Sequence, residues 1–241
     1  LLKKIIPPMI ELAKTIVIAT PHSRYDHLQG NLLAELQSVN VVRIHNAEEL
    51  NNHYLESINP DYIFFPHWSW IIPSSVYRKY ECVVFHMTDL PYGRGGSPLQ
   101  NLIVRGFKET QLTALRCVRE LDAGDIYLKQ PLSLLGTAEE ILSRAADLMT
   151  GMILEIITRR IFPTPQRGDI TEFSRRKPED GDITGLTDIN QIYDYIRMLD
   201  ADGYPSAFID FGRIVLEFSQ CKKTENGLEA VVRISEKDNE K

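Results

Sequence analysis

Short apolar strands that alternate with amphipathic helices constrain the fold of this chain more than any other feature. Runs of β-branched and apolar residues predict buried strands at 14–20 (KTIVIAT), 39–45 (VNVVRIH), 62–65 (YIFF) and 82–86 (CVVFH). Helical patterns lie between them at 31–38 and 46–61, the second with Asn46 and Glu49 at the capping-box spacing. This alternation predicts a doubly wound α/β fold with a mainly parallel sheet.

Three of these strands end in polar residues that the fold brings to one edge of the sheet. They end at Pro21-His22, at Pro66-His67-Trp68 and at His86. Because ligands bind at the carboxyl ends of parallel strands, we expect a pocket there. A polar, glycine-rich loop follows His86 and lets the backbone approach a ligand closely, and a helix is predicted from Leu99 onward.

The second half of the chain is predicted to hold a strand at 111–121, a strand at 126–134 and a long helix at 137–160, where Thr137 and Glu140 form a capping box. Composition then shifts toward Pro, Gly and charge. We therefore divide the chain into a main α/β domain over 1–165, a linker or extended arm over 166–187 and a small α+β C-terminal domain over 188–241. The first 14 residues are expected to form a helix or tail, and 236–241 a disordered tail.

Composition narrows the functional classes. The net charge of −6 argues against a large phosphate-backbone partner, but leaves contact with an RNA end through one basic face open. No apolar run approaches the roughly 20 residues that span a membrane. Cys82, Cys117 and Cys221 show no CxxC spacing, which favours a cytoplasmic protein without disulfides or structural zinc. The histidines show no metal-ligand spacing, so we expect no metal.

His86 and Asp122 form the candidate reactive pair. A histidine can take or give a proton near pH 7, and a carboxylate beside it fixes its tautomer and raises its basicity. The expected strand order places the two residues on neighbouring strand ends. The alternative is that His86 is a polar boundary residue and that DAGD at 122–125 is an ordinary turn.

The segment FHMTDLPYGRGGSPLQN at 85–101, followed by LDAGD at 121–125, resembles the signature of formyltransferases that use 10-formyltetrahydrofolate. That signature has Asn-x-His, then Ser, Leu-Pro, Arg-Gly and Pro-x-Gln, and later Asp-x-Gly-Asp. The matching residues here are His86, Thr88, Leu90-Pro91, Arg94-Gly95, Pro98, Gln100, Asp122, Gly124 and Asp125. The segments at 61–73, 175–183 and 196–208 are also similar to this family.

The resemblance implies an enzyme, with 1–165 as its catalytic domain, that transfers a formyl group from 10-formyltetrahydrofolate to a primary amine without a metal or a covalent enzyme intermediate. His86 would donate a hydrogen bond to the formyl oxygen or shuttle the amine proton. Asp122 would orient His86 or accept the proton through water, and Thr88 is a further catalytic candidate.

The resemblance also implies the residues that bind the folate donor. They are the loop residues His67, Trp68, Ser69, Trp70 and Ile71, together with Arg94, Gly95 and Asp125. A pteridine needs a flat apolar slot, and the loop can supply one wall. The alternative is that Trp68 and Trp70 pack the core.

One position departs from the family pattern. The asparagine expected two residues before the histidine is Val84. In the family that amide holds the formyl oxygen, and loss of such a donor costs about 2.7–4 kcal/mol. Three replacements stay open: a backbone N–H near residues 87–88, the Thr88 hydroxyl and Asn101. Otherwise the enzyme is slow, or the chain is a silent folate or nucleotide-sugar binding protein.

The acceptor is the least constrained part of the prediction. A short and acidic segment follows Pro165, which makes a poor tRNA platform. We therefore expect a small acceptor, foremost the amine of a nucleotide-linked amino sugar, with methionyl initiator tRNA as the alternative. A generic α/β domain without a folate site is the remaining alternative.

Overall fold

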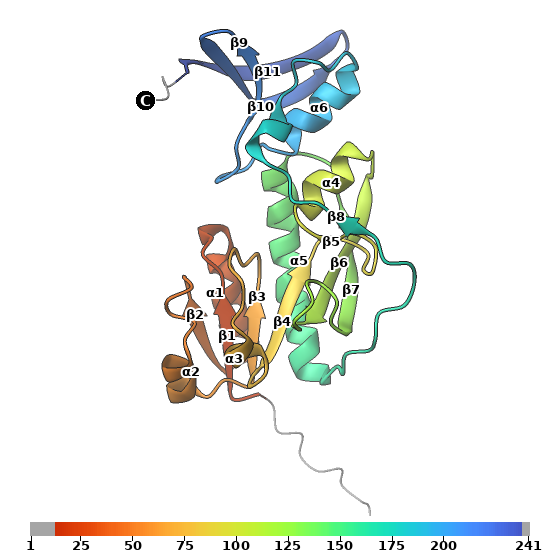
Figure 1. Cartoon of the computed structure of the whole chain (residues 1–241). Coiled ribbons are helices and arrows are strands. Elements are labelled where there is room, and N and C mark those ends of the chain that lie inside the picture. The colour runs from red at the N-terminus through yellow and green to blue at the C-terminus, as the bar shows by residue number, and fades with distance from the viewer. Residues whose placement is uncertain (1–12, 238–241) are drawn as a thin grey trace, which may run out of the picture.

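The computed structural model describes residues 13–237, so the expectations for the first 12 residues and for 238–241 lie outside the described residues. A six-stranded sheet with the order β2-β1-β3-β4-β6-β7 forms its centre (Figure 1). Its strands are β1 (Thr15–Ala19), β2 (Asn40–Ile44), β3 (Tyr62–Phe65), β4 (Glu81–His86), β6 (Glu109–Arg116) and β7 (Ile126–Ser133). The first four pair in parallel. Strand β6 runs the opposite way and pairs antiparallel with both β4 and β7, so five of the six strands share one direction, which confirms the mainly parallel sheet.

Helices cover both faces of this sheet, as a doubly wound fold requires. One core cluster joins the sheet to α1 (Asp26–Glu35), α4 (Pro98–Val104) and α5 (Ala138–Arg159). A second cluster on the other face joins it to α2 (Asn52–Ile58) and α3 (Ser74–Tyr77). The predicted capping box of α5 is present, because the Glu140 N–H donates to Thr137 Oγ1 at 3.3 Å and the Thr137 N–H to Glu140 Oε2 at 2.8 Å.

The predicted bounds of three elements are wrong. The helix expected at 31–38 is α1, which begins at Asp26 and ends at Glu35. Helix α2 begins at Asn52, because the Asn51 side chain caps it by accepting from the Tyr54 N–H at 2.9 Å. Asn46 and Glu49 do exchange hydrogen bonds, but they close a turn before the helix. Strand β6 ends at Arg116 instead of residue 121, and the chain from 117 to 125 folds back as a loop.

The segment 166–187 runs along the main domain. Its strand β8 (Glu172–Phe173) pairs in parallel with β5 (Arg94–Gly95), and a short 3₁₀ helix η2 (Pro178–Gly181) follows. Another 3₁₀ helix, η1 (Ser23–Tyr25), precedes α1. No helix in the part of the chain that the structure describes is long and apolar enough to cross a membrane.

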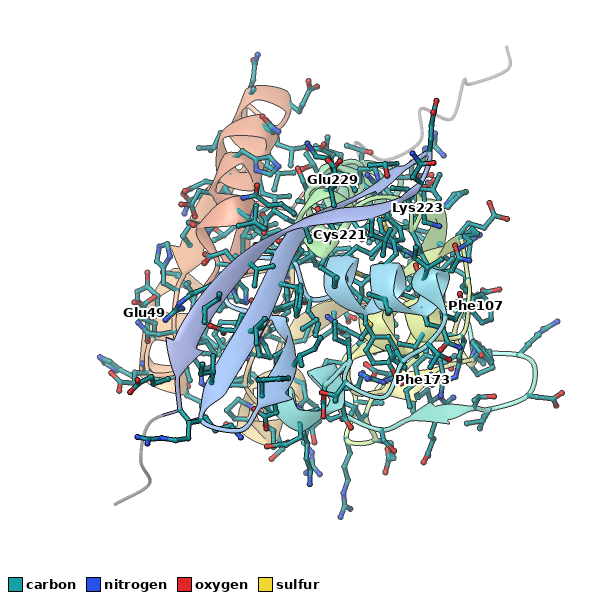
Figure 2. The ribbon with its side chains drawn as sticks, turned by 90° about the horizontal axis from the view of Figure 1, so that it is seen from above. Glu49, Phe107, Phe173, Cys221, Lys223 and Glu229 are labelled. Atoms are coloured by element: carbon teal, nitrogen blue, oxygen red, sulfur yellow. The ribbon has the colours of Figure 1, made fainter. Side chains whose placement is uncertain are left out.

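The C-terminal part forms the predicted helix and strands. It consists of α6 (Ile189–Arg197), β9 (Ala207–Phe211), β10 (Ile214–Thr224) and β11 (Gly227–Glu236), the strands forming an antiparallel sheet that Figure 2 shows from above. Its small core contains Ile183, Ile196, Ala207 and Cys221. The Arg197 guanidinium ties this part to the main domain, since it donates to the carbonyls of Leu134 at 2.6 Å and Gly136 at 2.9 Å.

Candidate active site

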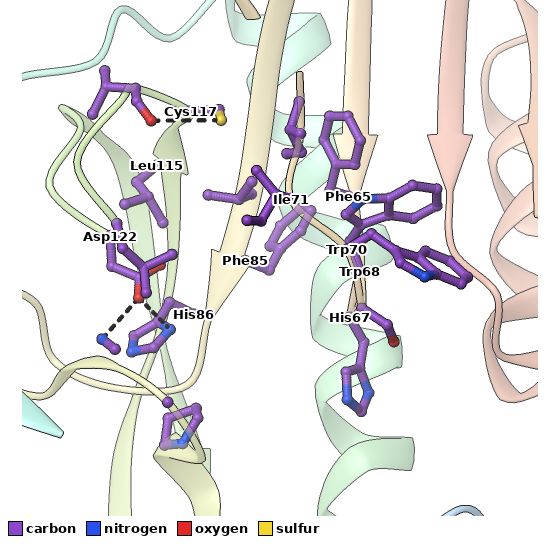
Figure 3. A pocket seen from close by; sticks show the side chains of 18 of the residues that line it. Phe65, His67, Trp68, Trp70, Ile71, Phe85, His86, Leu115, Cys117 and Asp122 are labelled. Carbon is purple, nitrogen blue, oxygen red and sulfur yellow. Dashed lines mark hydrogen bonds and ion pairs between the residues drawn. The ribbon is translucent and has the colours of Figure 1, made fainter. Parts of the chain in front are cut away.

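A pocket of about 690 Å³ lies beside the carboxyl ends of β3 and β4, between the loop after β3 and the loop after β6 (Figure 3). Its lining is largely apolar and includes Trp68, Ile72, Val84, Phe85, Leu115 and Val118. His86 and Asp122 also line it. The pocket therefore combines a slot for a flat apolar ligand with the ionisable groups His86 and Asp122 on its wall.

His86 ends strand β4 and is nearly buried, with 8% of its side chain exposed. Its Nε2 lies 2.8 Å from the carbonyl oxygen of Gly93. Because a carbonyl only accepts hydrogen bonds, Nε2 carries a proton in this arrangement. Nδ1 lies 3.5 Å from Asp122 Oδ2 and faces this carboxylate.

Asp122 reaches His86 from the loop that folds back after β6, not from a strand end as expected. Its backbone has a left-handed φ of 53°, and its Oδ2 accepts from the Gly95 N–H at 2.9 Å. The turn depends on Gly124, because a Cβ there would lie 1.8 Å from the carbonyl oxygen of Arg116. The structure thus brings His86 and Asp122 together, as expected, and adds a contact with the Gly95 N–H that the sequence did not predict.

His67 lies at the end of the pocket near η1. Its backbone φ is 54°, its Nδ1 is 3.3 Å from the Tyr25 hydroxyl, and its ring lies 4.5 Å from that of His22 between centroids. Burial, helped by the neighbouring His22 and Arg24, lowers the pKa of His67 to about 3. The imidazole is therefore neutral at pH 7, and it suits hydrogen bonding better than charge pairing.

Trp68 both packs against the core and lines the pocket. It packs edge-on against Phe65, with centroids 5.6 Å apart, and it lines the pocket. Its buried indole N–H has no hydrogen-bond partner among residues 13–237. Trp70 and Ile71 also line the pocket but are 44% and 94% exposed, which places them at its rim, whereas the Ser69 hydroxyl lies 3.4 Å from His22 Nε2.

Three predicted site residues are not among those that line the pocket. Thr88 is fully buried, and its hydroxyl donates to the Gly93 carbonyl at 3.4 Å. The Arg94 guanidinium donates to Gln166 Oε1, with Nη2 at 2.7 Å. The main-chain carbonyl of Asp125 accepts from the Arg116 N–H at 2.8 Å. These residues shape the loops around the pocket, and their proposed direct roles find no support in this geometry.

Val84 lies on the same face of β4 as His86, since side chains alternate along a strand, and it lines the pocket. The side chains considered as replacements for the missing amide are engaged elsewhere. Asn101 donates to the carbonyls of Gly96 at 3.0 Å and Ser174 at 2.9 Å. The Thr88 hydroxyl is bound to Gly93 as described above. Neither of these two side chains is therefore free to take the place of the missing amide.

Sequence reasoning missed several residues of the pocket. Tyr25, Met149 and Tyr204 line it from η1, α5 and the segment after α6, and Arg119 and Arg175 bring positive charge. Nothing in their spacing along the chain indicates that they meet. Among the described residues, no three His, Cys, Asp or Glu side chains lie close enough to hold a metal ion together.

Comparison with known proteins identifies the family. A model of the formyl transferase family matches residues 24–157, and a model of the C-terminal domain of methionyl-tRNA formyltransferase matches residues 178–235. The solved structure of methionyl-tRNA formyltransferase from Clostridium thermocellum is 48% identical, with a TM-score of 0.90, over 93% of this chain and 100% of that chain.

More distant proteins are also similar to this chain. The methionyl-tRNA formyltransferase of Rickettsia massiliae is 26% identical over 175 residues, and the match spans 70% of this chain but only 57% of that relative. A sugar N-formyltransferase from a Shewanella species is 15% identical over 83% of this chain and 93% of that chain, with a TM-score of 0.65, which indicates a shared fold alone. On the match over residues 24–157, this chain belongs to the formyl transferase family.

Proposed function

We propose that this chain transfers a formyl group from 10-formyltetrahydrofolate to the amino group of methionyl initiator tRNA. The observation that carries this proposal is the 48% identity to the Clostridium thermocellum methionyl-tRNA formyltransferase over all of that chain. The match of residues 178–235 to a methionyl-tRNA formyltransferase C-terminal domain adds to it. The comparisons favour this acceptor over the amino sugar that we expected first, because the similarity to the sugar enzyme is only 15%.

The pocket suits the folate donor. Trp68, Phe85 and Leu115 supply apolar walls for a flat heterocycle, and the unpaired indole N–H of Trp68 can satisfy one of its polar atoms. The donor carries the formyl carbon that the amine attacks. We place this carbon beside His86 and Asp122, because they are the ionisable pair on the pocket wall.

His86 and Asp122 then manage the proton of the attacking amine. Nε2–H of His86 is committed to the Gly93 carbonyl, so neutral His86 presents the lone pair of Nδ1. As the amine forms its bond to the formyl carbon it becomes acidic, and Nδ1 takes its proton directly or through Asp122. The Asp122 carboxylate, 3.5 Å away, stabilises the imidazolium that results. The same proton can return to the departing nitrogen of the folate.

Two positive side chains on the pocket lining support an RNA acceptor. Arg119 and Arg175 line the pocket, and Arg175 follows β8 at the boundary with the C-terminal part. A guanidinium suits the phosphate of a terminal nucleotide. A small basic contact of this kind reconciles an RNA acceptor with a chain of net charge −6.

An acceptor panel tests this proposal. Purified chain and radiolabelled 10-formyltetrahydrofolate would be incubated with methionyl initiator tRNA, methionyl elongator tRNA or a nucleotide-linked amino sugar, with His86→Gln as the control. We expect label on the initiator tRNA at least about 100-fold faster with the wild type than with the variant. Faster labelling of the sugar would overturn the acceptor, and tight donor binding without labelling of any acceptor would indicate a silent binding protein.

A further inference from the structure

Gln166 makes an unusual set of contacts just behind the reactive pair. We propose that Gln166 is the positioning residue that fixes Asp122 relative to His86 by joining three distant segments of the chain through its side-chain amide. This inference rests on the proposed function for its kinetic consequence, but its geometric part stands on the contacts alone. The sequence assigned Gln166 to the start of a linker and gave it no role.

The nitrogen of this amide holds the loop that carries Asp122. Nε2 of Gln166 donates to the main-chain carbonyl of Asp122 at 2.8 Å and to that of Gly124 at 2.8 Å. These bonds use both N–H groups of the amide. Since Asp122 has a left-handed φ of 53°, which few non-glycine residues adopt, this loop needs such external support to keep its shape.

The oxygen of the same amide binds Arg94, next to the residue that holds the Asp122 carboxylate. Oε1 of Gln166 accepts from Arg94 Nε at 3.2 Å and Nη2 at 2.7 Å. Arg94 is covalently joined to Gly95, whose N–H donates to the Asp122 carboxylate at 2.9 Å. The contacts therefore close a ring, from Gln166 through Arg94 and Gly95 to Asp122 and back to Gln166.

The segment that closes this ring also holds His86. The His86 Nε2 is bound to the Gly93 carbonyl, two residues before Gly95, so residues 93–95 hold both members of the pair. The N–H groups of Gly93 and Arg94 in turn donate to the carbonyl of Thr171, each at 2.9 Å. Loss of the Gln166 bonds would free the Asp122 loop while His86 keeps its own support, which changes the distance between them.

The position of Gln166 itself is well defined. Two residues before it, Thr164 pairs with Ile126 at the start of β7 through two backbone hydrogen bonds of 2.8 and 2.9 Å. Gln166 is half-buried and does not line the pocket, so it acts through its neighbours and not on the substrate. The same contacts explain why Arg94, which does not reach the pocket, occurs in the signature around His86.

Two substitutions test the contacts of the Gln166 amide nitrogen and amide oxygen separately. Gln166→Glu keeps an oxygen for Arg94 but turns the other oxygen toward the carbonyls of Asp122 and Gly124, whereas Arg94→Met removes only the contact to Oε1. The matched control is Gln29→Glu in α1, where Nε2 donates to the Val41 carbonyl at 2.9 Å away from the pocket lining. All three variants would be compared with the wild type for kcat, KM and the thermal midpoint.

We expect Gln166→Glu to lower kcat by about 10- to 100-fold with both KM values within about threefold, since misplacement of about 1 Å can cost a factor of 100. Arg94→Met should lower kcat less than Gln166→Glu does. Gln29→Glu should leave kcat unchanged, although its thermal midpoint falls about as much as that of Gln166→Glu. A kcat for Gln166→Glu equal to that of Gln29→Glu, or a change confined to KM, would overturn the inference.

A second readout does not depend on formyl transfer. The imidazole ¹⁵N resonances of His86, assigned with a His86→Gln sample, report the environment of Nδ1 beside Asp122. We expect Gln166→Glu to shift the Nδ1 resonance and Gln29→Glu to leave it in place. Unchanged resonances in Gln166→Glu would refute the positioning role, whereas a shift in a protein that formylates no acceptor would retain that role and reject the proposed function.

Discussion

Val84→Asn is the most informative single substitution for the chemistry of this pocket. It restores the amide that the family signature places two residues before the histidine. Val84 lines the pocket on the same face of β4 as His86, so the new amide would point into the same space. The two side chains considered as replacement donors, Thr88 and Asn101, are bound to main-chain carbonyls.

The size of the effect follows from this placement. A donor aimed at a developing oxyanion contributes about 2.7–4 kcal/mol, or a factor of 100 to 1,000 in kcat. An asparagine introduced without further adjustment will not be ideally oriented, so we expect kcat to rise by at least about 10-fold. Burial of the amide in a half-buried strand position should lower the free energy of unfolding by about 1 kcal/mol.

The assay is single-turnover transfer of labelled formyl to methionyl initiator tRNA at saturating donor. Val84→Leu is the matched control, because leucine has nearly the shape of asparagine but no donor. We expect the rate of Val84→Leu to stay near that of the wild type. If a folded Val84→Asn protein is no faster than Val84→Leu, the formyl oxygen already has its donors or lies elsewhere, and the argument from Val84 fails.

Further predictions concern stability and donor binding. Because burial lowers the pKa of His67 from 6.5 to about 3, the unfolded chain takes up a proton there before the folded chain does as the pH falls. The wild type should therefore lose about 2 kcal/mol more unfolding free energy between pH 7 and pH 5 than His67→Asn, measured by urea denaturation, and equal losses would refute a buried neutral His67. Gly124→Ala should destabilise by about 2–4 kcal/mol, because its Cβ would lie 1.8 Å from a carbonyl oxygen, whereas Gly30→Ala in α1, with nothing within 4 Å, should stabilise by about 1 kcal/mol. Trp68→Phe should weaken binding of 5-formyltetrahydrofolate about 10-fold in calorimetry, and unchanged affinity would remove the indole N–H from the donor site.

Much of the fold was predictable from local patterns. Apolar runs and capping residues predicted the strand at 82–86 and the helix at 137–160, and both are observed. The boundaries that failed depend on contacts distant in sequence or on competing caps. Strand β6 stops after Arg116, whose N–H bonds to the Asp125 carbonyl and closes the loop between them, and no residue within 111–121 signals that the chain folds back.

The site was predictable only in part. His86 and Asp122 were found because the signature and the expected sheet both pointed to them, and they do lie together. Thr88 and Arg94 belong to the same signature, yet they hold loops instead of lining the pocket. Tyr25 and Tyr204 enter the pocket from opposite ends of the chain, and this proximity arises only from packing.

The most direct test of the account is whether His86 and Asp122 together carry formyl transfer. Single-turnover transfer from 10-formyltetrahydrofolate to methionyl initiator tRNA would be measured for the wild type, His86→Gln and Asp122→Asn, each first shown to bind 5-formyltetrahydrofolate by calorimetry. We predict a loss of at least about 100-fold in rate for each variant with donor affinity retained. Donor binding with undiminished transfer by either variant would contradict the assignment of this pair as the reactive centre.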